Sequence, residues 1–255
     1  MITIKNDEEY KIMKRAGEIL ALTMNMIEKN IKPTVTAAKL DQVAYDYIIN
    51  SDAKPAFLGY KGYNYTICAS LNNEVIHGFP LKTKVLKDGD IISIDLGCKY
   101  KGYYADMAAT FPVGEVNSSK LRLIKSTEKA LSIGIENAIP GNYIGDIGYS
   151  IQENVESDGF SVVKEFVGHG IGLNLHEEPQ IPNYGLRKTG PMIKEGMSFA
   201  IEPMVNAGKD KVITKSDNWT VITEDGKDSA HFEHTIFIKD GRPEILTKFE
   251  NKRGN

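Results

Sequence analysis

The chain has 255 residues, of which 41% are hydrophobic and 25% are charged, and its formal net charge is −3. This length suits one large domain or two small ones, and the composition is ordinary for a soluble globular protein. The sequence gives no electrostatic case for binding nucleic acid or anionic lipid, and no uncharged stretch approaches the ~20 apolar residues of a membrane span.

The first residues of the chain and its cysteines indicate the cellular location of the protein. The first six residues lack the basic and apolar segments of a signal peptide. Cys68 and Cys98 are the only cysteines, and they form no disulfide-framework pattern. A reducing cytoplasm is therefore the predicted location.

Helices and then strands are predicted in the first half of the chain. Apolar residues at helical spacing predict a helix that is capped by Asn6 or Asp7 and runs to about Asn30. A second helix is expected from about Thr36 to Asn50. Strand-like segments then follow at 66–69, 91–96 and 103–111, and the last two form a hairpin that turns near 99–102.

The second half repeats this order of elements. Helices are expected at about 119–138 and 144–157, and strands at 161–167, 197–203 and 232–238. The last two strands would also form a hairpin, but with about twenty extra residues that include Trp219. Long connections inside compact domains are often functional.

A shift of 107 residues aligns the two halves. It places Pro33 on Pro140 and the string V-L-K-D-G-D-I-I-S-I-D on M-I-K-E-G-M-S-F-A-I-E, so that Asp95 falls on Glu202. Gly-turn-strand units look alike in many proteins, which is the alternative explanation. A duplication predicts one domain with two pseudo-symmetric α/β halves, residues 1–115 and 116–255.

Strand alternation predicts which side chains share a face of the sheet. Ile94 and Leu96 face away from Asp95, and Ile201 faces away from Glu202. The same alternation separates Phe232 and Ile236 from Glu233. The apolar sides are therefore expected to pack on the four helices, while the carboxylates of both halves point together into one concave site.

Five residues are predicted to form one metal site: Asp95, Asp106, His169, Glu202 and Glu233. A single carboxylate near a strand end is usually a solvated or capping residue, so the prediction depends on the whole set. Four carboxylates raise one another's pKa when they are buried together, and divalent cations remove that cost. An oxygen-rich set suits Mn, Fe, Co or Zn in five- or six-coordination, and two such ions can share a hydroxide.

The local strings around the histidines indicate different roles for them. His77 in N-E-V-I-H-G-F-P and His176 in G-L-N-L-H-E-E-P are candidates to hold a substrate carbonyl or amide, although ordinary loop histidines are the alternative. His169 lies between glycines, where the backbone can approach a metal closely. His234 shares the apolar strand face and is expected to be packed, and the role of His231 is open.

Several strings together resemble type I methionine aminopeptidases of the short bacterial kind. They are A-F-L-G-Y-K-G-Y, N-N-E-V-I-H-G-F-P, G-D-I-I-S-I-D-L-G, V-G-H-G-I-G, L-H-E-E-P-Q-I-P, F-A-I-E-P-M-V-N-A-G and F-E-H-T. The resemblance implies the pseudo-two-fold pita-bread fold, in which a curved antiparallel sheet is backed by four helices. It also implies a metallo-exopeptidase that removes the initiator methionine from nascent proteins when the next residue is small.

The resemblance further implies a role for each metal-site residue. Asp95 and Asp106 would hold one metal, His169 and Glu202 the other, with Asp106 and Glu233 bridging. A bridging water would attack the scissile carbonyl, and Glu202 would act as general base and then as general acid.

The resemblance also assigns the residues that contact the substrate. His77 would contact the scissile amide, and His176 would stabilise the tetrahedral intermediate. The methionine side chain would lie in a pocket lined by Tyr60, Tyr63, Cys68, Trp219 and Phe57, although plain core packing is the alternative for each aromatic residue. Some relatives carry Cys in place of Phe57 and an aromatic residue in place of Leu175, which bears on the pocket shape.

Two other functions stay open at the level of sequence. An X-Pro aminopeptidase or prolidase shares the fold and a similar ligand set, but it usually carries an extra N-terminal domain for which this chain has no room. A non-catalytic peptide-binding module typically loses metal ligands. For the main interpretation a monomer is the family default, and docking at the ribosome suits the activity although no basic patch argues for it.

Overall fold

The computed structural model describes residues 2–249, so the end of the predicted second half, residues 250–255, lies outside the described residues. The four predicted helices are confirmed, with α1 at Asp7–Asn30, α2 at Ala37–Asn50, α3 at Ser118–Asn137 and α4 at Ile144–Ser157. The side chain of Asn6 accepts hydrogen bonds from the backbone of Glu8 and Glu9, which satisfies amide groups that have no partner within the first turn of α1.

Within residues 2–249, nine strands form the main sheet, and they pair antiparallel. Its path is β1-β4-β5-β14-β9-β7-β8, while β2 pairs with β4 and β15 pairs with β14. The strands are β1 (Lys54–Pro55), β2 (Ile67–Leu71), β4 (Ile91–Tyr100), β5 (Tyr103–Pro112), β7 (Gly168–Gly170), β8 (Glu177–Ile181), β9 (Ser198–Ile201), β14 (Glu233–Lys239) and β15 (Arg242–Ile245).

The two halves of the chain meet at the pairing of β5 with β14. Glu233 is opposite Ala108 and His234 is opposite Met107 in this pairing. On the other side of β14, His234 is opposite Ile201 of β9, as the predicted second hairpin requires. Strands of the two halves therefore lie side by side in one continuous sheet. The predicted curved antiparallel sheet is confirmed.

The offset of 107 residues recurs in the local structure. The first residues of α2 and α4 differ by this number, and so do their last residues. The isolated bridge between Thr36 and Val85 has its counterpart between Tyr143 and Met192 at the same offset. Each half thus holds its shorter helix against the segment before its central strand in the same way, and the predicted pseudo-two-fold fold is confirmed.

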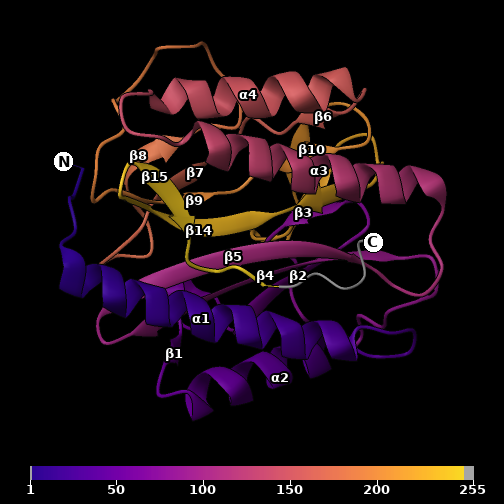
Figure 1. The fold of residues 1–255 in the computed structure, drawn as a ribbon. Helices are drawn as coiled ribbons and strands as arrows, with labels where there is room; N and C mark the ends of the chain where they lie inside the picture. The colour runs from indigo at the N-terminus through magenta and orange to yellow at the C-terminus, as the bar shows by residue number, and fades with distance from the viewer. Residues whose placement is uncertain (1, 250–255) are drawn as a thin grey trace.

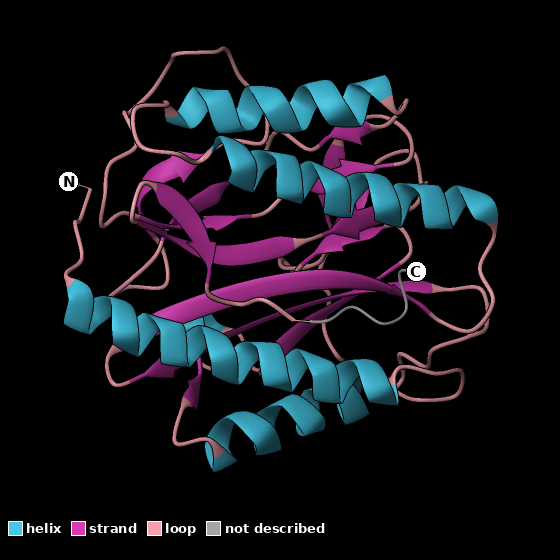
Figure 2. Cartoon of the chain, viewed as in Figure 1, coloured by secondary structure: helices cyan, strands magenta, loops and turns pink. Residues whose placement is uncertain are grey.

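The helices cover one face of the sheet, with α1 and α2 over the first half and α3 and α4 over the second (Figures 1 and 2). Leu20 of α1 and Ile147 of α4 belong to the same buried cluster as Ile94 and Ile201 of the sheet. Burying such a side chain contributes about 1.5–3 kcal/mol, so the packing of the helices on the sheet stabilises the fold. The acidic residues of the same strands point to the opposite face.

The predicted length of the strand at residues 161–167 is wrong. Residues 161–167 were expected to form a single strand, but β6 covers only Ser161–Val162 and β7 begins at Gly168. The reason is that the two pieces serve different sheets, since β6 pairs with β10 whereas β7 pairs with β8 and β9. Local hydrophobic character predicted the strand but not its change of partner.

The long connection between β9 and β14 folds into two small sheets. One has the order β13-β10-β6 and the other has the order β11-β12-β3. Their remaining strands are β3 (Glu74–Ile76), β10 (Met204–Asn206), β11 (Val212–Thr214), β12 (Val221–Thr223) and β13 (Ser229–His231). Because β3 belongs to the first half, the β11–β12 hairpin of the second half lies against the other half of the chain.

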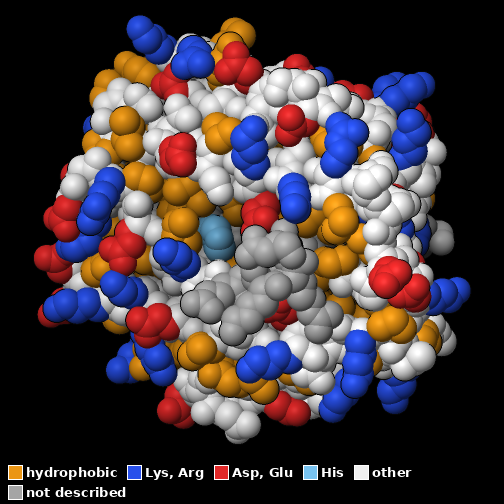
Figure 3. Space-filling model, turned by 45° about the vertical axis from the view of Figure 1, so that its right-hand side comes forward, with side chains coloured by type: hydrophobic (Ala, Val, Ile, Leu, Met, Phe, Trp, Pro, Cys, Tyr) orange, Lys and Arg blue, Asp and Glu red, His pale blue; other side chains and the backbone are white. Residues whose placement is uncertain are grey.

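No helix within residues 2–249 has both the length and the apolar character that a membrane span requires. On the face shown in Figure 3, Lys and Arg side chains are interspersed with Asp and Glu side chains. This mixed pattern agrees with the absence of a basic run in the sequence.

Candidate metal centre and peptide cavity

An open cavity of about 180 Å³ lies on the face of the sheet away from the helices. It brings together every residue that was predicted for the metal site, the catalytic groups and the methionine pocket, and it adds Lys61 and Leu175. The residues that line it are Phe57, Tyr60, Lys61, Tyr63, Cys68, His77, Asp95, Asp106, His169, Leu175, His176, Glu202, Trp219 and Glu233.

Four metal-site residues lie in strands of the main sheet, and Glu202 directly follows β9. Ligand atoms of Asp106, His169 and Glu233 lie within 4.8 Å of one another. The Nε2 atom of His169 lies 3.6 Å from Oε1 of Glu202. Asp95 is paired with Cys68 across β2 and β4 and lines the same cavity. Residues from both halves of the chain therefore converge on one centre.

Buried carboxylate oxygens at this centre have no partner. Oδ1 of Asp95, Oδ1 of Asp106 and Oε1 of Glu233 are buried without a hydrogen bond to any described residue. Burial raises the pKa of these carboxyl groups and that of Glu202 well above the usual values, and their mutual repulsion raises it further. An unpaired buried oxygen costs free energy that a bound cation removes, so these residues fit divalent metal.

The imidazole of His169 is prepared to act as a neutral ligand. Its Nδ1 atom lies 2.9 Å from the carbonyl oxygen of Gly170, which can only accept, so Nδ1 carries the proton and Nε2 is free to bind a cation. Burial lowers the pKa of His169 to about 3, and His176 lowers it further. The neutral form is the form that binds metals.

The glycines on either side of His169 also allow neighbouring strands to approach closely. A Cβ atom at Gly168 would lie 2.4 Å from the carbonyl oxygen of Ala200, and one at Gly170 would lie 2.2 Å from that of Glu178. Both distances are too short for any side chain. The glycines are therefore required by the close approach of β9 and of the residues in β8, which the sequence did not reveal.

His77 and His176 lie beside the metal-site residues. His77 has a left-handed backbone with φ of +58°, an uncommon conformation for a residue other than glycine, and such residues cluster at functional sites. Burial lowers the pKa of His77 to about 4, with a further contribution from His176, so its imidazole is neutral at neutral pH. The ring of His176 lies 4.3 Å from that of His169 between centroids.

Tyr60 orients His176, which sequence reasoning missed. Its Oη atom lies 2.9 Å from Nδ1 of His176, and the two rings are stacked with centroids 5.4 Å apart. The two residues are 116 positions apart in the chain. No local pattern could have predicted this hydrogen bond, although the assignment of both residues to one cavity placed them near each other.

The aromatic residues of the predicted pocket are both packed and exposed to the cavity. The rings of Tyr63 and Trp219 meet edge to face with centroids 5.0 Å apart. The hydroxyl of Tyr63 donates to the carbonyl oxygen of Ile67 at 2.9 Å, which holds its ring in place. Aromatic rings and the thiol of Cys68 form a surface that suits a flexible thioether.

His231, whose role was open, lies against Glu202. Its Nε2 atom is 3.6 Å from Oε2 of Glu202 and has no hydrogen-bond partner among the described residues. The side chain is 2% exposed. His169 and His231 thus approach different oxygens of the same carboxylate. His234, which was expected to be packed, faces away from this centre, and its Nδ1 atom lies 2.9 Å from the hydroxyl of Thr247.

A candidate metal centre on a curved antiparallel sheet backed by helices is the arrangement of a metallopeptidase, and comparison with known proteins identifies the family. Residues 11–240 match the model of metallopeptidase family M24, and the chain belongs to this family. Within it, the chain is 50% identical over 250 residues to the methionine aminopeptidase of Clostridium acetobutylicum, covering 98% of this chain and 100% of that protein.

Solved structures agree with this assignment. The fold matches the crystal structure of methionine aminopeptidase from Thermotoga maritima with a TM-score of 0.96 and 47% identity, covering 97% of this chain and 100% of that one. Prolidase from Pyrococcus furiosus matches with a TM-score of 0.78 and 24% identity, and the match covers 97% of this chain but only 66% of the prolidase. The likeness to prolidase concerns the fold alone.

Proposed function

We propose that this protein removes the N-terminal methionine from nascent proteins and peptides when the next residue is small. The observation that carries the proposal is the single cavity, in which partnerless buried carboxylate oxygens lie beside an aromatic pocket. The full-length similarity to methionine aminopeptidases supports the substrate. The cavity would place a methionine side chain in the pocket and its scissile bond beside the metal centre.

The metal-site residues have distinct tasks in this proposal. Asp95 and Asp106 would hold one divalent ion and His169 and Glu202 a second, with Asp106 and Glu233 between them. When bound, such ions supply a water of lowered pKa and polarise a carbonyl group. Mn, Fe, Co and Zn all accept a set of carboxylate and imidazole ligands.

The proton-transfer task falls to Glu202. Its carboxylate would take a proton from the attacking water and deliver it to the leaving amine, which general acid–base catalysis requires. His77 and His176 are neutral donors on the cavity wall, where they can hydrogen-bond the substrate amide and the developing oxyanion. Tyr60 would hold the ring of His176 in the required orientation.

Replacing His176 should separate catalysis from metal binding. We expect His176→Ala to keep its metal and lower kcat by about 10²-fold, because removal of one oxyanion donor typically costs 10²–10³. Metal content and kcat are measured on the same preparation. Tyr60→Phe, which keeps the ring but loses the hydrogen bond to His176, should cause a smaller fall. Loss of metal from His176→Ala would make His176 a ligand and contradict its role as a donor.

Peptide specificity tests the substrate. The peptide Met-Ala-Ser should be cleaved with release of methionine, whereas Met-Lys-Ser should be cleaved at least roughly 100-fold more slowly. The reason is that the resemblance to methionine aminopeptidases implies a tight site for the second residue. Product analysis by mass spectrometry measures both rates. Equal rates would reject the requirement for a small second residue. Preference for an X-Pro peptide would instead favour the prolidase-like activity, and a metal titration without binding would favour a non-catalytic module.

The wider setting follows from the same proposal. We take the chain as one catalytic domain, with halves 1–115 and 116–255, because both halves contribute to the cavity. Cys68 and Cys98 are buried and free, which suits a reducing cytoplasm. A monomer that meets its substrates as they leave the ribosome is the simplest arrangement for this activity.

A further inference from the structure

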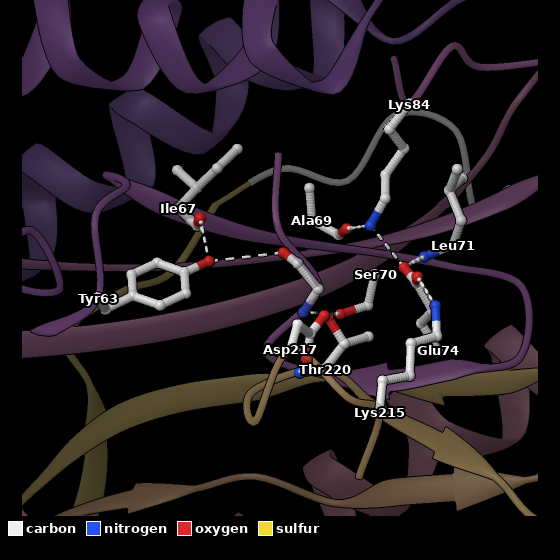
Figure 4. A network of polar contacts seen from close by, with 11 residues as sticks. Tyr63, Ile67, Ala69, Ser70, Leu71, Glu74, Lys84, Lys215, Asp217 and Thr220 are labelled. Atoms are coloured by element: carbon white, nitrogen blue, oxygen red, sulfur yellow. Dashed lines mark hydrogen bonds and ion pairs between the residues drawn. The ribbon is translucent and has the colours of Figure 1, made fainter. Parts of the chain in front are cut away.

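The side chains of Lys84 and Lys215 converge on the buried carboxylate of Glu74 (Figure 4). Glu74 accepts from Nζ of Lys84 at 2.6 Å and from the backbone of Leu71 at 2.9 Å through one oxygen. Its other oxygen accepts from Nζ of Lys215 at 2.8 Å. Lys84 also donates to the carbonyl oxygen of Ala69 at 2.8 Å. Glu74 and Lys84 thus form a fixed site, and Lys215 reaches it from a position 141 residues away.

Lys215 opens the turn that joins β11 to β12. Its backbone donates to the carbonyl oxygen of Thr220 at 2.8 Å, which closes the turn. Asp217 accepts from the backbone of Trp219 at 2.9 Å and from that of Thr220 at 2.8 Å. The turn is therefore a compact unit. The orientation of the Trp219 side chain depends on how the whole turn is oriented.

The same turn supplies one wall of the cavity. Trp219 lies edge to face against Tyr63 at 5.0 Å and against His77 at 6.0 Å between ring centroids. The last ladder pair of β11 and β12 is Thr214 with Val221, so the turn extends beyond the ladder. The ion pair of Lys215 with Glu74 ties the start of this extension to the first half of the chain.

We propose that the ion pair between Lys215 and Glu74 positions Trp219 as a wall of the methionine pocket. Lys215 is a positioning residue, because it acts through Trp219 and lies outside the cavity lining. The inference rests on the proposed function, since it takes this cavity to be the site for the methionine side chain. Lys84 keeps Glu74 paired when Lys215 is replaced, so the contact can be removed without leaving a buried carboxylate alone.

The variant Lys215→Met tests the proposal, because it keeps the length of the side chain and removes its charge. Lys215 is 40% exposed, and ion pairs of this kind shift an equilibrium by about two- to five-fold. We expect KM for Met-Ala-Ser to rise by roughly two- to five-fold with kcat unchanged, because a poorly placed wall weakens substrate and transition-state binding equally. Metal content should stay equal to that of the wild type.

Trp219 is the only tryptophan of the chain, so its fluorescence reports the turn directly. Acrylamide should quench it more strongly in Lys215→Met than in the wild type, and Lys215→Arg should restore both KM and quenching. The matched control is Lys211→Met, which removes an exposed lysine directly before β11 that forms no ion pair with any other residue in the range 2–249.

The outcomes are separable from those of the proposed function. Unchanged KM in Lys215→Met would overturn the inference even if quenching changed, and so would an equal effect of Lys211→Met. If the wild type fails to cleave Met-Ala-Ser, the proposed function fails, while the comparison of quenching in the two variants still decides whether Lys215 holds Trp219.

Discussion

Removal of divalent metal should abolish peptide cleavage. A chelator followed by desalting is expected to lower kcat/KM for Met-Ala-Ser by at least about 10²-fold, because without metal neither the attacking water nor the scissile carbonyl is activated. Mn, Fe, Co and Zn are then added back singly, and activity and metal content are measured together. Activity that persists in protein free of metal would contradict a metal-dependent mechanism.

Metal binding should also release protons and stabilise the fold. Burial and mutual repulsion raise the pKa of the carboxyl groups of Asp95, Asp106, Glu202 and Glu233, so the metal-free site holds protons that the bound cation must displace. Calorimetry in buffers of different ionisation enthalpy measures this release.

At a metal concentration of 100 times Kd, the free energy of unfolding should rise by about 2.7 kcal/mol. Asp106→Asn is the variant that should lose both effects.

Replacing Glu202 by glutamine should lower kcat by about 10²–10⁴-fold, because general acid–base groups typically contribute this much. The substitution keeps the size of the side chain and removes its charge and its ability to carry the proton. The effect should exceed that of His176→Ala, because Glu202→Gln also removes one metal ligand. Steady-state kinetics across several metal concentrations separates the two losses, since saturating metal restores occupancy but not the proton carrier.

Glu224→Gln is the matched control for this variant. Glu224 is an exposed carboxylate that follows β12 and lies outside the cavity lining, so its replacement should leave kcat and metal content unchanged. Near-wild-type kcat in Glu202→Gln at saturating metal would show that another group moves the proton. His231, which lies 3.6 Å from Glu202, would then be the next residue to replace.

Much of the fold could be predicted from short-range signals. Helical spacing of apolar residues and the cap at Asn6 located α1, and similar signals located α2, α3 and α4. Strand alternation placed Asp95 and Glu202 on the face away from the helices. The internal repeat predicted that Asp95 and Glu202 belong to one site, because equivalent residues of a duplicated fold occupy equivalent positions.

The candidate site was predicted as a set of residues but not as a geometry. The cavity lining contains each residue that was predicted for the metal site, for catalysis and for the methionine pocket, the pocket residues having been implied by the family resemblance. Two contacts in the site link residues that are far apart in sequence. They are the hydrogen bond between Tyr60 and His176 and the approach of His231 to Glu202. Such contacts depend on how distant surfaces pack, and a single sequence holds no local record of them.

The sequence by itself determined the helices, the strand faces, the repeat and the residue types of the site, because these follow from hydrogen bonds and alternation over a few neighbouring residues. Only the tertiary structure decided that β6 and β7 serve different sheets, that Gly168 and Gly170 permit close strand approach, and that Lys215 reaches Glu74. These features arise when strands from the two halves are buried against each other. Several pairings fit the local sequence patterns equally well, and the pairing that buries the most apolar surface is the one that forms.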